Sequence, residues 1–194
     1  MSGDHEDLPV ASRVRRLEER LIAAGLASDE EIDELLAGFY ADASPVNGAR
    51  LVARAWTDEG FRGRLLADGS AAAAEAGYGT QTGDYQLRVV ANEPDRHNVI
   101  VCTLCSCYPL SLLGPSPSWY KSLAYRSRAV REPRAVLAGF GLHLPESTGI
   151  DVWDSTAEVR YLVLPVRPAG TDGLSRDDLA ALVTRNGLIG TAAV

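Results

Sequence analysis

Apolar residues in the first half of the chain recur every three or four positions, a spacing that predicts amphipathic helices. Residues with capping or helix-stopping preferences bound most of these segments: Ser and Thr before a helix, Pro in its first turn and Gly after its end. Ser12 is expected to cap the first helix and Gly25 to end it, and the capping pair Ser28 and Glu31 is expected to open the second. The predicted helices are 12–25, 28–39, 45–56, a short continuation at 61–66, and 71–77.

The second half changes to the alternating or continuous apolar runs of β-strands. Strands are expected at 87–91, 99–101, 150–153 and 159–166, and short helices at 133–139 and 175–185. The order, helices first and a small sheet-containing region after them, indicates an α+β fold.

Residues 1–42 carry two amphipathic, highly charged helices, more than a small core requires. We expect them to form an N-terminal helical arm that packs on a partner subunit; a solvated helical hairpin is the alternative. Residues 43–194 are then the domain that carries the chemistry.

Composition is that of a globular domain, with 46% hydrophobic and 23% charged residues in 194. The net charge of -7 disfavours nucleic acid or an anionic membrane as a partner, because both are bound through clustered positive charge. No apolar run approaches the ~18 residues of a membrane span, and the first residues lack a basic-then-apolar signal. A cytoplasmic protein is expected.

The cysteines are the unusual feature, since all three lie within six residues: Cys102, Cys105 and Cys107. A disulfide would leave one thiol over, and a buried-thiol explanation does not account for the clustering. Structural zinc and a four-cysteine iron–sulfur cluster each need one more ligand, which His97 or an external group could provide for zinc.

The remaining possibility is a metal site that also uses the backbone. The amide nitrogens of Ser106 and Cys107 lie between the sulfurs, so three sulfurs and two nitrogens could hold an octahedral metal with one open position. A trivalent low-spin ion favours such ligands, whereas zinc does not.

The segment Asn98 to Pro109, NVIVCTLCSCYP, closely resembles the metal-binding claw of the nitrile hydratase alpha subunit. The similarity covers nearly the whole chain and continues through the stretches WYK at 119–121, YRSR at 125–128, VWDS at 152–155, AEVRYLVLP at 157–165 and LVTR at 182–185. Thr103 and Tyr108 are the residues of cobalt-type members. The resemblance therefore implies non-corrin Co(III), with Fe(III) as the less expected metal.

The family also implies a role for each claw residue. Cys102, Cys105 and Cys107 would bind the metal through sulfur, and Ser106 and Cys107 through their amide nitrogens. Cys102 stays a thiolate, Cys105 becomes a sulfinic acid and Cys107 a sulfenic acid, with Cys107, Cys105 and Ser106 in the catalytic site. Two arginines of a beta-type partner, one chain or two, bind the oxidised sulfurs, and the reaction hydrates a nitrile to an amide.

Residues outside the claw receive further expectations. By the family pattern, Arg160, Gln81 and Tyr108 surround the metal ligands or the partner interface. Asp154 and Glu158 are paired carboxylates that could act as acid and base, but we expect them instead at the interface or around the metal ligands. Trp119 is expected in the pocket wall, beside Tyr120 and Lys121.

Leu110 departs from the family, because cobalt-type members usually have Trp after Tyr-Pro. This departure favours a wider pocket and a bulky heteroaromatic or nucleoside-like nitrile as substrate. The rival within the same fold is the metal subunit of thiocyanate hydrolase, and the rivals from another class are a metal carrier and a zinc-binding interaction module. His5, His97 and His143 receive no role.

Overall fold

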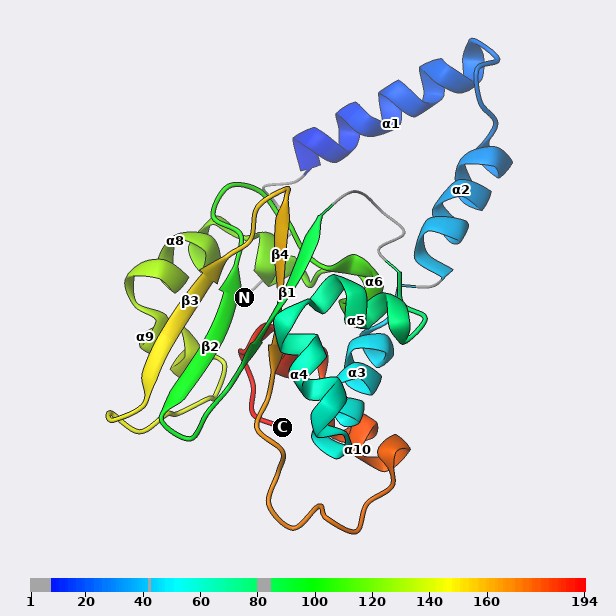
Figure 1. The fold of residues 1–194 in the computed structure, drawn as a ribbon. Helices are drawn as coiled ribbons and strands as arrows, with labels where there is room; N and C mark the ends of the chain where they lie inside the picture. Colours follow the sequence, from blue (N-terminus) through cyan, green and yellow to red (C-terminus); the bar gives the residue numbers. More distant parts are fainter. Residues whose placement is uncertain (1–7, 42, 80–84) are drawn as a thin grey trace. The chain divides into compact units, whose positions relative to one another are not determined.

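The N-terminal helices belong to a unit of their own. The structure is a computed structural model that describes residues 8–41, 43–79 and 85–194. The chain divides into two compact units, Met1–Asp42 and Ala43–Val194. In the first unit, α1 spans Leu8–Ala23 and α2 spans Asp29–Ala41 (Figure 1).

Capping explains where α2 begins. The backbone N–H of Ser28 donates to Glu31 Oε2 at 2.8 Å, and the N–H of Glu31 donates to Ser28 Oγ at 3.2 Å, which confirms the predicted capping pair. The predicted start of α1 is wrong, because Ser12 lies inside the helix. Pro9 stands in its first turn, where a missing N–H costs nothing, so the helix can begin at Leu8.

The second unit combines short helices with four strands. Its described elements, in chain order, are α3 (Pro45–Thr57), α4 (Glu59–Ala67), α5 (Gly69–Glu75), β1 (Gln86–Ala91), β2 (Arg96–Val101), α6 (Leu110–Leu113), α7 (Ser118–Lys121), α8 (Leu123–Arg131), α9 (Pro133–Gly139), β3 (Gly149–Asp154), β4 (Val159–Leu164), α10 (Arg176–Leu182) and α11 (Arg185–Ile189). The α+β class and all four strands are confirmed. Among the described residues, no helix has both the length and the apolarity needed to cross a membrane.

Side-chain caps subdivide the helical segments more finely than periodicity predicted. The carboxylate of Asp58 accepts the N–H of Phe61 at 2.8 Å, and that of Asp68 accepts the N–H of Ala71 at 3.0 Å, so α4 and α5 are separate, capped helices. The single helix expected at 175–185 is likewise two. The Ser175 capping box opens α10, and Thr184 caps α11 by accepting the N–H of Gly187.

Both strand pairs are parallel, and this register positions the site. β1 pairs with β4, and β2 pairs with β3, with Val101 opposite Asp154. The C-terminal ends of β2 and β3 therefore lie side by side. Whatever follows Val101 in sequence must meet the residues around Asp154.

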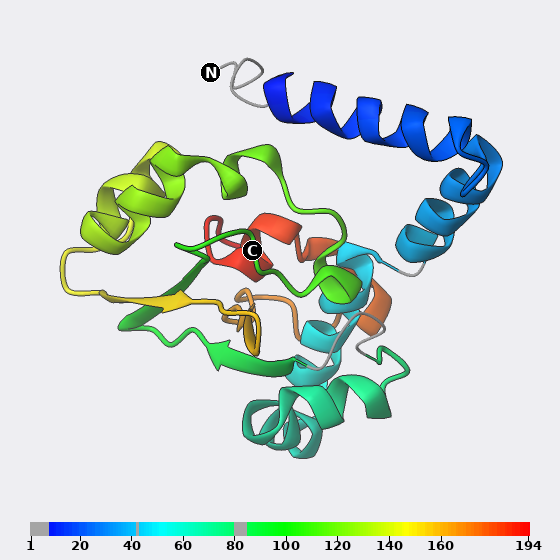
Figure 2. The same ribbon diagram turned by 90° about the horizontal axis from the view of Figure 1, so that it is seen from above.

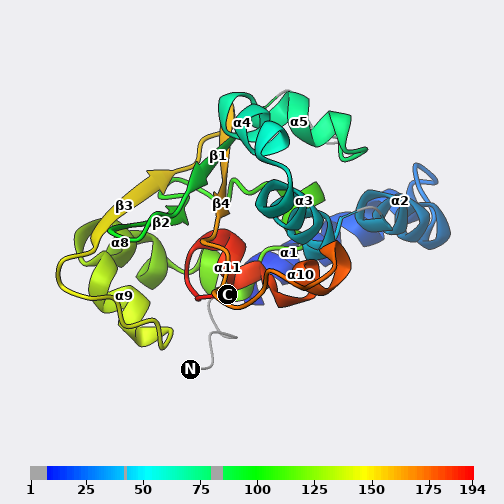
Figure 3. The same ribbon diagram turned by 60° about the horizontal axis from the view of Figure 1, so that its bottom comes forward.

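Helices cover the strands on two sides. Figure 2 shows α8 and α9 on one side, where they pack on β2 and β3, and α4 and α5 on the other, against β1. α3 packs against α6, α10 and α11, and α11 also contacts β4 (Figure 3). Buried apolar residues fill the space between these layers, including Leu51, Val52, Phe61, Leu87, Ile100, Leu162 and Leu188.

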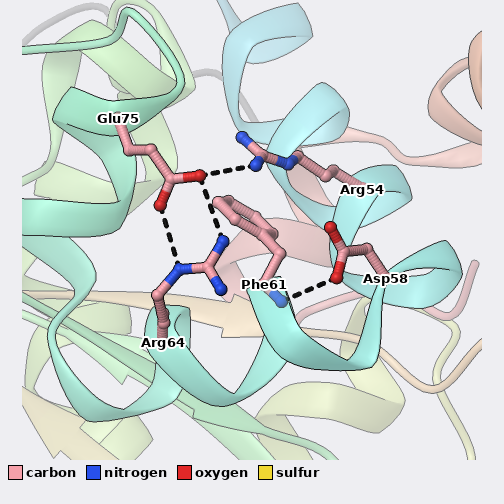
Figure 4. A network of polar contacts seen from close by, with 5 residues as sticks. All are labelled: Arg54, Asp58, Phe61, Arg64 and Glu75. Carbon is pink, nitrogen blue, oxygen red and sulfur yellow. Dashed lines mark hydrogen bonds and ion pairs between the residues drawn. The ribbon is translucent and has the colours of Figure 1, made fainter.

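A polar network joins α3, α4 and α5. The carboxylate of Glu75 accepts from Arg54 Nη2 at 2.5 Å and from Arg64 Nε at 3.0 Å (Figure 4). The Arg54 guanidinium carbon lies 3.9 Å from the centre of the Phe61 ring, a cation–π contact. The hydrogen bonds from Arg64, the first cause, and from Arg54 hold the pKa of Glu75 below its usual value.

His97 belongs to a buried polar network at the start of β2. Its Nε2 donates to the carbonyl of Gly190 at 2.7 Å, and its Nδ1 lies 3.2 Å from Asn92 Nδ2, which fits a neutral ring that accepts from Asn92. Asn98 is fixed in the same network, because its N–H donates to Asn92 Oδ1 and its Oδ1 accepts from Trp153 Nε1. Burial lowers the pKa of His97 below its usual 6.5.

This burial predicts acid sensitivity. Because the folded pKa of His97 is depressed, the unfolded chain binds a proton that the folded chain does not, and its stabilising contribution is lost as the pH falls below about 6.5. We expect the free energy of unfolding in urea to fall less steeply between about pH 7 and about pH 5 in His97→Gln than in the original chain. His143→Gln, at an exposed position, is the control. Equal slopes for His97→Gln and the original chain would contradict the prediction.

Candidate metal centre

Three sulfur atoms converge where the chain leaves β2. Cys102 Sγ lies 3.4 Å from Cys105 Sγ, which in turn lies 3.1 Å from Cys107 Sγ. All three sulfurs are within 4.8 Å of one another. Cys102 is fully buried, Cys107 is half-buried and Cys105 is exposed, so the cluster is anchored in the core on one side and open on the other.

The local backbone turns because strand pairing ends there. The N–H of Ser155 donates to the carbonyl of Val101 at 2.7 Å, the last bond of the β2–β3 ladder. The chain then folds back, and the N–H of Cys105 donates to Cys102 Sγ at 3.2 Å. The N–H groups of Ser106 and Cys107 also lie against the Cys105 sulfur and favour its thiolate. The two amides that the sequence suggested as metal ligands thus point at the sulfur cluster.

The thiols have unequal acidity. The pKa of Cys105 is lowered to about 7, first by a hydrogen bond from the Cys107 thiol, and the pKa of Cys107 is raised to about 12, first by burial. Of these two thiols, Cys105, the exposed one, therefore loses its proton at the lower pH. A soft cation approaching from the open side meets the more acidic of the two.

Asp154 of β3 and Arg126 of α8 bind the backbone between Cys102 and Cys105. Asp154, at the end of β3, accepts from Thr103 N at 2.9 Å and from Thr103 Oγ1 at 2.5 Å. Arg126 of α8 donates to the carbonyls of Thr103 and Leu104. A strand end and a helix therefore fix the backbone between Cys102 and Cys105.

Tyr120 and Arg160 support the segment where it leaves the site. Tyr120 Oη donates to the carbonyl of Cys107 at 3.0 Å, and Arg160 Nη1 donates to that of Tyr108 at 2.7 Å. Burial raises the pKa of Tyr120, so its hydroxyl keeps the proton that it donates. Arg160 also stacks on Tyr85, with its guanidinium carbon 4.1 Å from the ring centre. Arg160 thus contacts the segment that carries the cysteines.

The other predicted residues that the structure describes have partners of their own. Leu110 is half-buried at the start of α6, and Trp119 packs on the rings of Tyr125 and Phe140, 4.9 and 4.6 Å away centre to centre. Glu158 accepts from Thr156 Oγ1 at 2.9 Å. Gln81 lies outside the described residues. Tyr108 is buried, and its hydroxyl donates to the carbonyl of Leu113.

The sequence did not indicate that Arg126 and Tyr120 support the cysteines. Arg126 lies 23 residues from Thr103 in the chain, too far for any periodic pattern to connect them. The stretch YRSR at 125–128, which contains Arg126, was noted in the sequence, but its contact with Thr103 could not be predicted. His97, considered as a zinc ligand, instead has both ring nitrogens engaged in the network at the opposite end of β2.

The donor set fits a soft or borderline metal and lacks a fourth side-chain ligand. Among the residues that the structure describes, the only group of three or more potential metal-binding side chains is Cys102, Cys105 and Cys107. A tetrahedral zinc site would need one more. Three sulfurs with two adjacent amides suit a metal that takes backbone nitrogen.

Comparison with known proteins agrees with this geometry. The family model described as nitrile hydratase, alpha chain, matches residues 8–192. The chain is 48% identical over 183 residues to the low-molecular weight cobalt-containing nitrile hydratase subunit alpha of Rhodococcus rhodochrous, covering 94% of this chain and 88% of that one. It is 43% identical over 200 residues to the thiocyanate hydrolase subunit gamma of Thiobacillus thioparus, covering 98% and 80%.

A solved structure has the same fold. A double mutant of the Fe-type nitrile hydratase from Comamonas testosteroni Ni1 superimposes with a TM-score of 0.88 at 42% identity, covering 97% of this chain and 91% of that chain. This structural similarity and the family match over residues 8–192 assign the chain to the same family. The chain belongs to the family of nitrile hydratase alpha chains.

Proposed function

We propose that this chain is the metal-bearing alpha subunit of a cobalt-type nitrile hydratase, which adds water to a nitrile and releases the corresponding amide. The observation that carries the proposal is the convergence of three sulfurs within 4.8 Å at the open end of β2. Cys102, Cys105 and Cys107 would hold non-corrin Co(III) through sulfur, and Ser106 and Cys107 through their amide nitrogens. A Lewis-acid ion supplies polarisation of the nitrile, which is otherwise a poor electrophile.

Cobalt rather than iron is supported by two features. Thr103 and Tyr108 are the residues of cobalt-type members, and the Rhodococcus rhodochrous relative is a cobalt-containing protein. The fold itself does not discriminate, since the Comamonas testosteroni structure is of the Fe type.

Oxidation of two cysteines is part of the proposal. Cys105 would be a sulfinic acid and Cys107 a sulfenic acid, while buried Cys102 remains a thiolate. The oxygen atoms add negative charge, which needs hydrogen-bond donors nearby. Arg126 and Arg160 donate to backbone carbonyls of the cysteine segment. The resemblance to the family implies that arginines of a beta-type partner, one chain or two, would provide the donors to the oxidised sulfurs.

The helical arm 1–42 would pack on that partner. Several of its described large apolar side chains are accessible, with Leu17 57%, Leu26 74% and Leu35 75% exposed. Exposed apolar surface of this kind marks an interaction site. Free thiols that must bind a metal also suit the reducing cytoplasm, where we expect the complex to work.

One experiment tests the function. The chain is co-expressed with its genomic neighbours in cobalt-supplemented medium, the metal is identified by elemental analysis, and the peptide 102–107 is weighed. We expect cobalt, two added oxygens on Cys105 and one on Cys107, and amide formation from nitriles. Zinc with unmodified cysteines would overturn the proposal in favour of a zinc-binding module. Cobalt without hydration activity would favour a metal carrier, and carbonyl sulfide from thiocyanate would favour a thiocyanate hydrolase.

The substrate would be a bulky nitrile, heteroaromatic or nucleoside-like, because Leu110 replaces a larger aromatic residue three positions after Cys107. We expect Leu110→Trp to lower kcat/KM for an aromatic nitrile relative to acetonitrile by about tenfold, since the ring refills the space. Leu110→Met, which preserves volume, is the control. An unchanged ratio in Leu110→Trp would reject the wide-pocket hypothesis.

A further inference from the structure

We propose that Arg126 is a positioning residue that, opposite Asp154, clamps the outer turn formed by residues 103–105 and thereby fixes the amide that donates to the Cys102 sulfur. The proposal deepens the proposed function, because the sulfur that it positions is one of the three that would bind the metal.

The guanidinium of Arg126 spans two consecutive carbonyls. Its Nε and Nη2 donate to the carbonyl of Thr103 at 3.3 and 2.9 Å, and Nη2 also donates to that of Leu104 at 3.0 Å. A planar fork suits such a paired contact, whereas the ammonium of a lysine carries all its N–H donors on one nitrogen. α8, which carries Arg126, lies beside β2, so the donor comes from a rigid element (Figure 1).

Asp154 holds the same turn from the other side. Its two carboxylate oxygens accept the N–H and the hydroxyl of Thr103. Thr103 therefore has its N–H, its hydroxyl and its carbonyl all bonded to charged side chains. Within the part of the chain that the structure describes, Arg126 and Asp154 form no ion pair with each other. Both charged groups instead make hydrogen bonds to the turn.

The turn has no apolar anchor of its own. Leu104, at its tip, is 86% exposed. Beside it lies a cavity of about 360 Å³, lined by Thr103, Leu123, Arg126, Ser127, Val130 and Arg131. Since no packed side chain holds Leu104 in place, polar contacts hold the turn: the hydrogen bonds from Arg126 and to Asp154, and the bond from the N–H of Cys105 to Cys102 Sγ.

One peptide unit connects Arg126 to the sulfur cluster. The carbonyl of Leu104 accepts from Arg126, and the N–H of the same peptide, which belongs to Cys105, donates to Cys102 Sγ at 3.2 Å. Hydrogen bonds at the two ends of one peptide polarise it in the same sense and strengthen each other. Arg126 thus acts on Cys102 without touching it.

The test compares variants in the complex of the full chain with its partner. The variants are Arg126→Gln, Arg126→Lys and Asp154→Asn, and the control is Arg131→Gln, which removes a charge from the same cavity. Two readouts are independent of activity: the rate of cobalt loss to a chelator, and hydrogen exchange of the peptide that contains residues 103–108, measured after growth with and without cobalt. Circular dichroism verifies folding.

We expect Arg126→Gln to lose cobalt about tenfold faster and to exchange the peptide 103–108, which contains the Cys105 amide, faster in both growth conditions, with Arg126→Lys intermediate and Arg131→Gln unchanged. Asp154→Asn should act in the same direction. Exchange and cobalt loss equal to those of the original complex in Arg126→Gln would overturn the clamp, as would equal effects in Arg131→Gln. If the original complex binds no cobalt, the proposed function is wrong. The clamp is then still tested by comparing hydrogen exchange of Arg126→Gln with that of the original complex in the metal-free samples.

Discussion

Cys102→Ser is expected to abolish metal binding and, with it, nitrile hydration. Cys102 is fully buried and contributes the sulfur nearest to the core, where no other described side chain can replace it as a ligand. A serine hydroxyl is a hard donor with a very high pKa and does not substitute for a thiolate. Elemental analysis of the purified complex should find about a tenth or less of the metal bound by the original protein.

Ser106→Ala is the matched variant. It removes a hydroxyl in the middle of the same segment but keeps the backbone amide that is proposed to bind the metal. We expect metal content close to that of the original chain. Loss of metal in Ser106→Ala would indicate hydroxyl ligation instead, and full metal occupancy in Cys102→Ser would contradict the three-sulfur site itself.

Gly190→Ala is expected to cause the largest loss of stability outside the metal centre. Gly190 ends α11 at φ 88°, and a Cβ there would overlap the carbonyl oxygen of Asn98. The positive φ costs an alanine about 1 kcal/mol, and the overlap must displace either α11 or β2, so the free energy of unfolding should drop by about 3 kcal/mol or more. Denaturant unfolding measures the change.

Gly141→Ala separates the two causes. Gly141 has almost the same backbone conformation, with φ 86°, but a Cβ added there would meet no atom within 4 Å. Only the conformational cost of about 1 kcal/mol should remain. If the two alanine variants lose the same stability, the close approach of α11 to β2 is not a determinant of the fold.

Helix boundaries were predictable where a side chain caps the backbone within three residues. The capping pair Ser28 and Glu31 forms in the structure as predicted, and Ser175 with Asp178 forms the same kind of capping box at the start of α10. Boundaries were mispredicted where competing local signals existed, as at Ser12, which lies inside α1. The four-residue helices α6 and α7 are too short to produce a period, so no pattern could indicate them.

The strands were predictable as elements, but not their pairing. Alternating apolar residues indicated β1, where Leu87 and Val89 are buried and Arg88 is exposed, and continuous apolar runs indicated β2 and the second half of β4, which are buried. That β2 lies parallel to β3, with Val101 opposite Asp154, depends on how the intervening helices pack.

For the site, the sequence by itself determined the three thiols, their spacing and the two amides between them, because these are neighbours in the chain and short-range geometry brings them together. Only the tertiary structure decided what holds them. Asp154 meets Thr103 across 51 residues, and Arg126 meets it across 23. Such contacts depend on strand register and helix packing, which sum many weak interactions over the whole unit, and therefore no local pattern encodes them.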